Sequence, residues 1–568
     1  MDRPGPYALI ALSDAPKSPA IEASSAATAG SAIEAIDPSD DIQLDFIIVG
    51  SGFGGSVSAL RLTEKGYKVA VLEQGKRWNK EDFAKSNWDT RKFLWAPGLG
   101  MHGILQMTLV KDAFFLHGAG VGGGSLVYAN TLLVPPASAW NDPRWVGMDW
   151  QQELVPHYEM AKKMLGAVPS QVIVETDRML KAVAEDMGRG DTFHRATVGV
   201  YFGEAGKIAP DPFFDGEGPE RTGCTLCGGC MVGCRVGAKN TLDRNYLYLA
   251  EKYGAKVVPE IRVTDIVPLP GKDGKPGGYE LTVVKSTGFW NEPVKVRARG
   301  VVVSAGSYGS VELLMKCKEK GSLPDLSPEL GRYLRTNSEA ILSVRSRKKN
   351  VDYSKGIAIT SGVYVDDKTH VEIVRYPAGS DAMASLTTVL TGDGPPWPRW
   401  MRWIGNIITK PLQFLRSSVP FGWAKASAIL LVMQPIDSHL RYVMRRRWWW
   451  PWKRRLDTEP GGGPKVPVYL PMANEVARRM AEKMDGVAQS GILEVVLNKA
   501  TTAHVLGGCP IGLTKEDGVV DPGGKVFGYE NFYVIDGSII PANLGVNPSL
   551  TITAMAERAM SQVPKKQA

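Results

Sequence analysis

A strand, turn, helix and second strand near the start of the chain restrict the fold more than any other feature. An apolar run over 45–49 leads into the glycine-rich turn 50–55, and a helical stretch and a second apolar run over 68–72 follow. Glycines permit the tight turn, and the free N–H groups at the start of the helix stabilise a pyrophosphate. Glu73 ends the second strand, about 20 residues after the glycines, where a carboxylate meets a ribose. The segment therefore predicts a Rossmann-like, dinucleotide-binding domain. The expected contacts are Gly50, Gly52, Phe53, Gly54, Gly55 and Glu73.

Later segments carry a resemblance to one family. They are a glycine-rich loop (118–126), a strand and turn (301–307), a segment similar to the second FAD segment of flavoproteins (534–538) and two polar segments (504–509 and 545–552). In this order they resemble the glucose-methanol-choline (GMC) oxidoreductases. The residues at 507–509 and 546–548 resemble those of the bacterial cholesterol-oxidase branch of this family.

The strand–turn–helix segment by itself does not separate FAD from NAD. The resemblance implies FAD as the cofactor. Val263 stands where such proteins contact the adenine. The family usually has Asn at the position of Tyr128 in the flavin loop, and Asn130 lies close by. The further implied FAD contacts are Gly118, Gly122, Gly123, Gly124, Ser125, Asn130, Val263, Ala305, Gly306, Asp536, Gly537, Asn547 and Pro548.

A chain of 568 residues is too long for one simple core, so we expect an α/β protein with two lobes. The second lobe is predicted to be a substrate-binding domain, built on a mixed or antiparallel β-sheet with helices. The predicted division is a disordered N-terminal arm (1–41), an FAD-binding domain (42–339) with a cysteine-rich segment (221–240), a substrate-binding domain (340–470) with a Trp/Arg-rich insertion (396–456), and a return to the FAD-binding domain (471–568) that carries the catalytic His and Asn.

The resemblance assigns catalysis to His504 and Asn547. An alcohol carbon releases a hydride only as its hydroxyl loses a proton, so the site needs a neutral imidazole and a neutral donor or acceptor beside it. His504 would orient the hydroxyl and take its proton, and Asn547 would hold the oxygen so that the C–H bond points at flavin N5. In cholesterol oxidases a carboxylate also shifts a ring double bond, and Glu372 is the candidate by position.

The predicted function is FAD-dependent oxidation of a hydroxyl on a sterol, steroid or similarly bulky hydrophobic alcohol to the ketone, by hydride transfer to the flavin. One alternative is a long-chain or terpenoid alcohol dehydrogenase that passes electrons through an iron–sulfur cluster to an external carrier. A second is a flavin-bearing lipid-binding protein without turnover, which the presence of both His504 and Asn547 disfavours. Dioxygen and an external carrier both stay open as the electron acceptor.

Four of the six cysteines lie within eleven residues, at Cys224, Cys227, Cys230 and Cys234. This spacing is typical of bacterial iron–sulfur ligands, and it resembles the three-iron segment of flavin-dependent glucose dehydrogenases. Arg235, however, replaces the proline that usually follows the fourth ligand. A 3Fe-4S or 4Fe-4S cluster, a structural zinc and buried thiols without metal all stay open. Clustered cysteines favour a reduced compartment, so we expect the cytoplasm.

Eight of the fifteen tryptophans lie between Trp397 and Trp452, and the basic run 445–455 contains no acidic residue. Indoles and cations together favour the headgroup region of a bilayer, which predicts peripheral contact with the inner face of the membrane. An ordinary solvated hairpin stays open. Nucleic-acid binding is not expected, since the net charge of +8 is modest for this length. No apolar run approaches the roughly 20 residues of a spanning helix.

Overall fold

The computed structural model describes residues 42–271, 277–288, 292–447 and 450–567. The predicted disordered arm 1–41 lies outside these residues, as do Trp448 and Trp449 of the basic run.

The first sheet is built on the predicted strand–turn–helix segment. Its strands lie in the order β12-β2-β1-β15-β14-β13, and β25 pairs with the end of β15. Parallel strands of this kind are buried on both faces, which explains the apolar runs over 46–49 of β1 and 69–72 of β2. The strands are β1 (Leu44–Val49), β2 (Val69–Leu72), β12 (Lys256–Val258), β13 (Ile261–Pro268), β14 (Tyr279–Lys285), β15 (Val294–Val303) and β25 (Phe532–Val534).

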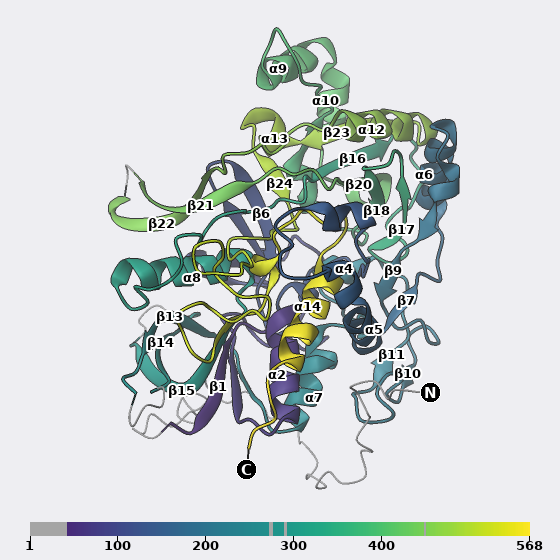
Figure 1. Ribbon diagram of the computed structural model, residues 1–568. Coiled ribbons are helices and arrows are strands. Elements are labelled where there is room, and N and C mark those ends of the chain that lie inside the picture. The colour runs from purple at the N-terminus through teal and green to yellow at the C-terminus, as the bar shows by residue number, and fades with distance from the viewer. Residues whose placement is uncertain (1–41, 272–276, 289–291, 448–449, 568) are drawn as a thin grey trace.

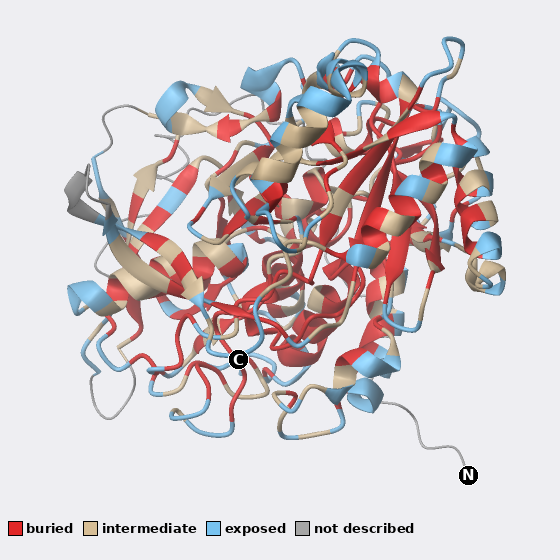
Figure 2. Ribbon diagram, turned by 90° about the horizontal axis from the view of Figure 1, so that it is seen from above, coloured by how far each residue is buried: buried red, intermediate tan, exposed pale blue. Residues whose placement is uncertain are grey.

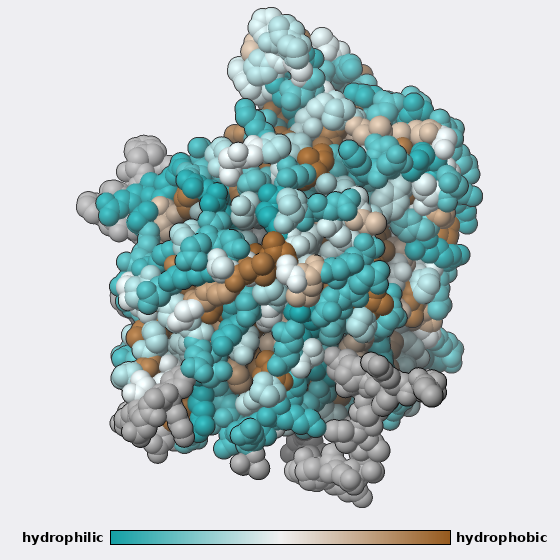
Figure 3. All heavy atoms as spheres, viewed as in Figure 1, coloured by the Kyte–Doolittle hydropathy of each residue, from teal (hydrophilic) through white to brown (hydrophobic). Residues whose placement is uncertain are grey.

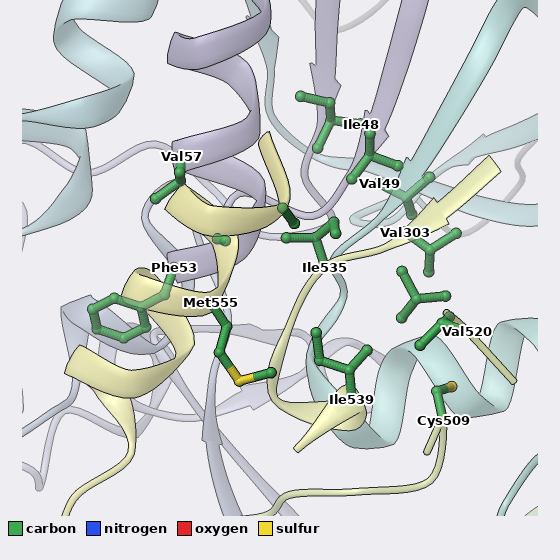
Figure 4. Close-up of a cluster of buried hydrophobic side chains, with 14 of the residues drawn as sticks. Ile48, Val49, Phe53, Val57, Val303, Cys509, Val520, Ile535, Ile539 and Met555 are labelled. Atoms are coloured by element: carbon green, nitrogen blue, oxygen red, sulfur yellow. The ribbon is translucent and has the colours of Figure 1, made fainter. Parts of the chain in front are cut away.

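Helices from both ends of the chain cover this sheet. Helix α2 (Phe53–Glu64) contacts α7 (Tyr246–Lys252) and the last helix, α14 (Ser549–Ser561), and α14 also contacts α5 (Val155–Met164) (Figure 1). Side chains of α2 and α14 meet Ile535 in the main hydrophobic cluster (Figure 4). Helix α8 (Gly306–Lys320) follows β15 directly. The C-terminal segment is therefore part of the cofactor-binding core.

A second sheet is antiparallel throughout and has the order β19-β23-β16-β20-β18-β17-β8. Helices α6 (Glu175–Asp186) and α12 (Pro471–Lys483) pack on it, and buried residues run through both sheets (Figure 2). The α/β fold class with a second, β-rich lobe is confirmed. The sheet also takes in β8 and β23, which lie outside the predicted segment 340–470. Its strands are β8 (His194–Arg195), β16 (Ala340–Ser346), β17 (Ile359–Tyr364), β18 (His370–Val374), β19 (Thr387–Val389), β20 (Ser427–Met433) and β23 (Gly486–Gly491).

Smaller elements connect the two sheets or project from them. Strand β24 (Ala500–Thr502) runs parallel to β6 (Ala113–Gly118), which pairs with β5 (Leu105–Leu109). Strands β21 (Leu440–Arg447) and β22 (Trp450–Pro460) form a hairpin. Helices α9 (Arg399–Thr409) and α10 (Pro411–Ser418) project beyond the second sheet at the top of Figure 1. The other short elements are α3 (Thr90–Phe93), β3 (Trp95–Ala96), β4 (Met101–His102), α4 (Trp150–Glu153), β7 (Ala167–Pro169), β9 (Thr197–Gly199), β10 (Ile208–Ala209), β11 (Arg221–Thr222), α11 (Trp423–Ala426) and α13 (Ile492–Val496).

Within the described ranges, no helix has both the length and the apolar character that crossing a bilayer requires.

Candidate active site

His504 lies two residues after β24 and is held by a carboxylate that the sequence analysis did not identify. Its Nδ1 is 2.9 Å from Oε2 of Glu339, whose side chain is fully buried. Thr502 Oγ1 donates to the same carboxylate oxygen at 2.9 Å and accepts from the backbone N–H of His504, also at 2.9 Å. Glu339 and Thr502 thus orient the imidazole, with Nδ1 toward Glu339.

The carboxylates near His504 offset the effect of burial on its pKa. Burial alone lowers the pKa of His504, but the carboxylates of Glu339 and Glu372 raise it, and the net pKa lies above its ordinary value. A proton taken up by the ring is therefore stabilised by the two carboxylates.

Asn547 and Glu372 form the second part of the site. Asn547 Nδ2 donates to Glu372 Oε2 at 3.1 Å, and Glu372 is fully buried on β18. Burial raises the pKa of Glu372 to about 7. Among the described residues, neither Glu372 Oε1 nor Asn547 Oδ1 has a hydrogen-bond partner. Buried polar atoms are rarely left unpaired, so this pair is suited to a polar group of a substrate.

The loop that carries Asn547 is fixed by Asn337, which the sequence analysis also missed. Asn337 Oδ1 accepts from the N–H of Gly545 at 2.8 Å, and its Nδ2 donates to the carbonyl of Val546 at 2.9 Å. Asn337 has a φ of 57°, a left-handed conformation that Asn tolerates better than most residues. The available signal was a short polar run, 336–339, directly before a buried strand.

The glycine-rich turn before α2 has the shape that a dinucleotide requires. A Cβ on Gly54 would lie 1.6 Å from the carbonyl oxygen of Ile535, so only glycine fits there. At Gly52 and Gly306, by contrast, no atom lies within 4 Å of an added Cβ. Gly52 begins α2 without a side-chain cap. This open approach to a helix N-terminus fits a pyrophosphate.

Two buried carboxylates hold the predicted cofactor segments together. Glu73 Oε1 accepts from the N–H groups of Gly75 (2.8 Å) and Gly120 (3.2 Å), and its Oε2 accepts from the hydroxyl of Ser51 at 2.7 Å. Asp536 Oδ2 accepts from the N–H of Gly306 at 2.9 Å. Strands β1, β2, β15 and β25 are parallel neighbours, so these segments meet at one edge of the sheet.

The residues of the glycine-rich flavin loop (118–126) lie against the glycine-rich turn 50–55. Gly118 ends β6, and a Cβ on Gly123 would lie 2.6 Å from the Cα of Gly52. Ser125 Oγ donates to the carbonyl of Gly122 at 2.6 Å, which closes the turn that contains Gly124. The predicted residues that flank Gly306, Asp536 and Asn547 are Ala305, Gly537 and Pro548, which begin α8, the turn after β25 and α14.

Two predicted FAD contacts, Asn130 and Val263, lie outside the segments described above. Asn130 is fully buried, has a φ of 70°, and both of its amide atoms are without a hydrogen-bond partner among the described residues. It is therefore a candidate to bind the polar part of a flavin. Val263 lies on β13, two residues after Ile261, whose N–H donates to the carbonyl of Glu73 at 2.8 Å. That position is next to the predicted ribose-binding residue.

The four clustered cysteines lie close together in the fold. Cys224, Cys227, Cys230 and Cys234 line one cavity, but no three His, Cys, Asp or Glu residues of the described chain are grouped as a metal would need. Cys230 is buried whereas Cys227 is exposed. Burial raises the pKa of Cys224 to about 12 and also raises that of Cys230, so both stay protonated thiols. The iron–sulfur ligand assignment therefore gains no support from the described residues, and it stays a prediction.

Lys239 links this cysteine segment to the flavin loop. Its Nζ is buried and donates to the carbonyls of Cys230 (2.8 Å) and Leu126 (2.9 Å). The segment therefore supports the loop that is predicted to contact the cofactor.

Comparisons with known proteins agree with this geometry. Two family models of the GMC oxidoreductases match residues 219–331 and 465–556, and a model of NAD(P)-binding Rossmann-like domains matches 48–78. A cholesterol oxidase of Acinetobacter baumannii is 48% identical over 528 residues, which cover 92% of this chain and 94% of the relative. The chain belongs to the GMC oxidoreductase family.

Other relatives of this GMC oxidoreductase span a similar length. A cholesterol oxidase of Mycobacterium tuberculosis is 46% identical over 542 residues, which cover 92% of this chain and 91% of the relative. A long-chain-alcohol oxidase of Arabidopsis thaliana is 23% identical, covering 92% of this chain and 67% of the relative. The crystal structure of pyridoxine 4-oxidase from Mesorbium loti superposes with a TM-score of 0.58 at 16% identity, covering 92% of this chain and 99% of that one, and shows the fold alone. The predicted family, its FAD cofactor and an alcohol oxidoreductase activity are confirmed.

Proposed function

We propose that this GMC oxidoreductase oxidises the secondary hydroxyl of a sterol or steroid to a ketone, with dioxygen as the electron acceptor. The observation that carries the proposal is the buried Glu372 beside Asn547. Oxidation of a simple alcohol needs no titratable group beyond His504 and the Glu339 that orients it. Moving a double bond in a sterol ring needs a further group that carries a proton, and Glu372 is such a group. The cholesterol oxidase relatives support both the substrate class and dioxygen as the acceptor.

The residues of the site divide the proton chemistry among them. His504 directs its Nε2 at the substrate hydroxyl and takes the proton, because Glu339 occupies the Nδ1 side at 2.9 Å. Asn547 holds the hydroxyl oxygen through its amide. Bound FAD supplies the hydride acceptor, and the turn 50–55, Glu73 and Asp536 would hold it. Glu372 would then move a proton between ring carbons of the ketone.

Glu339 is a positioning residue in this scheme. Glu339→Gln keeps the size of the side chain but removes the charge that stabilises the protonated ring. We expect turnover to fall about tenfold, since one pKa unit is worth about 1.4 kcal/mol. We also expect the His504 midpoint in the pH profile of kcat/KM to move to lower pH, because a carboxylate that raised this pKa is gone.

The matched control for Glu339 is Thr502→Val, which removes one donor to the carboxylate and keeps its charge. Its pH midpoint should stay close to that of the wild type. An unchanged rate and midpoint in Glu339→Gln would exclude the positioning role.

The function is tested by anaerobic bleaching of the flavin absorbance with sterols, terpenoid alcohols and fatty alcohols. We expect sterols to bleach it fastest and air to restore the colour with formation of hydrogen peroxide. Bleaching by fatty alcohols alone would favour a long-chain alcohol dehydrogenase instead. Sterol binding without any bleaching would favour a lipid-binding protein without turnover.

All six cysteines are free, which supports a reducing location such as the cytoplasm.

A further inference from the structure

Helices α9 and α10 expose several large apolar side chains to solvent. Trp400, Ile404 and Ile408 follow one another at four-residue spacing on α9, and Leu412 and Leu415 continue the surface on α10, so each set shares a helix face. Ile408 is 73% exposed, Leu412 is 68% exposed, and Phe421 beyond α10 is 77% exposed. The helix pair stands clear of the body of the molecule in the space-filling view (Figure 3). Large apolar side chains gathered in this way mark an interaction site.

The opposite face of the helix pair is anchored. Trp403 Nε1 donates to Thr388 Oγ1 at 2.8 Å, which ties α9 to the edge strand β19. Ser417 of α10 is fully buried, and Arg345 Nη2 donates to the carbonyl of Phe421 at 2.9 Å. The apolar residues are therefore held outward by the packing of their own helices.

The charge of this region has one sign. No Asp or Glu occurs between residues 394 and 436, whereas five Lys or Arg residues do. Three of these cations, Lys410, Arg416 and Lys425, are exposed. Exposed cations beside exposed indole and aliphatic side chains complement the anionic headgroups and acyl chains of a bilayer.

The apolar surface is also connected to the catalytic site. Helix α13 contacts α9, and it contacts β24, the strand that leads to His504. Leu497, which directly follows α13, is also an exposed apolar side chain, at 48%. A lipid-dissolved alcohol that leaves a bilayer at α9 and α10 is thereby close to the elements that carry the catalytic histidine.

We propose that α9, α10 and Phe421 form a docking surface for a bilayer that contains anionic lipid. This inference rests on the proposed function for its purpose, the uptake of a lipid-dissolved sterol, but its evidence is the surface itself. It places docking on the helix pair at the start of the predicted insertion 396–456, whereas Trp448 and Trp449 of the basic run lie outside the described residues.

The test is cosedimentation of the FAD-loaded enzyme with vesicles of phosphatidylcholine and phosphatidylglycerol. In the triple variant Ile408→Ser, Leu412→Ser and Phe421→Ser, we expect vesicle affinity to fall at least about tenfold, because the apolar share of binding is lost. Rising salt should weaken binding of the wild type. The matched control is Leu99→Ser, Ile208→Ser and Leu513→Ser, three residues 75%, 60% and 59% exposed elsewhere on the surface. Its affinity should be unchanged.

Four outcomes separate the possibilities. Unchanged vesicle affinity in the triple variant, with flavin content and melting temperature equal to the wild type, overturns the docking surface. A wild-type dimer that the same variant dissociates, without vesicle binding, assigns the face to a second copy and also overturns it. Vesicle binding that the variant abolishes, in an enzyme that no sterol bleaches, supports docking and contradicts the proposed substrate. If both proposals hold, turnover of vesicle-bound sterol falls in the triple variant while turnover of cyclodextrin-solubilised sterol is retained.

Discussion

His504→Ala and Asn547→Ala each lower the rate of flavin reduction by at least about 10²-fold, because a positioned proton-transfer group contributes that much. The His504 variant loses the ring that Glu339 and Thr502 orient. The Asn547 variant leaves the buried carboxylate of Glu372 without its amide partner at 3.1 Å and without the group that would hold the hydroxyl. Asn547 is one of many implied FAD contacts, and neither variant changes the glycine-rich turn, Glu73 or Asp536, so FAD should stay bound.

The measurement is the rate of anaerobic bleaching after rapid mixing with substrate, with flavin content from the absorbance of the purified variants. Asn141→Ala, at an exposed position, serves as the asparagine control. A wild-type rate in either catalytic variant would remove that residue from the mechanism.

The second large effect is expected at Glu372, on the double-bond shift and not on ketone formation. A group that carries a proton between ring carbons must first be ionised, and an amide is not able to take the proton. Glu372→Gln should therefore lower the isomerisation rate by at least about 10²-fold. Its amide keeps the volume of the side chain and can still pair with Asn547. Ketone formation should therefore change by less than about tenfold, within the spread of conservative changes at a site.

The pH dependence of this step follows from burial. Since burial raises the pKa of Glu372 to about 7, the carboxylate is the main form only above that pH. Isomerisation by the wild type should fall as the pH is lowered through about 7. Product analysis with a sterol that carries a ring double bond gives the ratio of conjugated to unconjugated ketone.

Glu494→Gln is the matched control for Glu372, since Glu494 is also buried and burial raises its pKa to about 8. That variant should leave the product ratio unchanged. Isomerisation that survives intact in Glu372→Gln would assign the base to another group.

The sequence predicted local features well because their information is contiguous. The apolar runs, the turn 50–55 and Glu73 all lie within one βαβ segment, and each has a direct physical requirement, such as the absence of any Cβ at Gly54. His504 and Asn547 were found through resemblance, since one histidine or asparagine has no distinguishing pattern of its own. The spacing of the four cysteines, by contrast, brings all four to one cavity, but spacing alone does not fix the side-chain directions on which ligand geometry depends.

Tertiary structure alone decided which distant side chains meet and which apolar side chains face solvent. Glu339 reaches His504 from 165 positions away, and Glu372 reaches Asn547 from 175 positions away, with no local signal in either pair. The same holds for the surface. Trp423 is 2% exposed, whereas Phe421, two residues earlier, is 77% exposed, although both belong to one aromatic-rich segment. Composition locates apolar residues along a chain, but the packing of α9, α10 and β19 determines which of them are left for a partner.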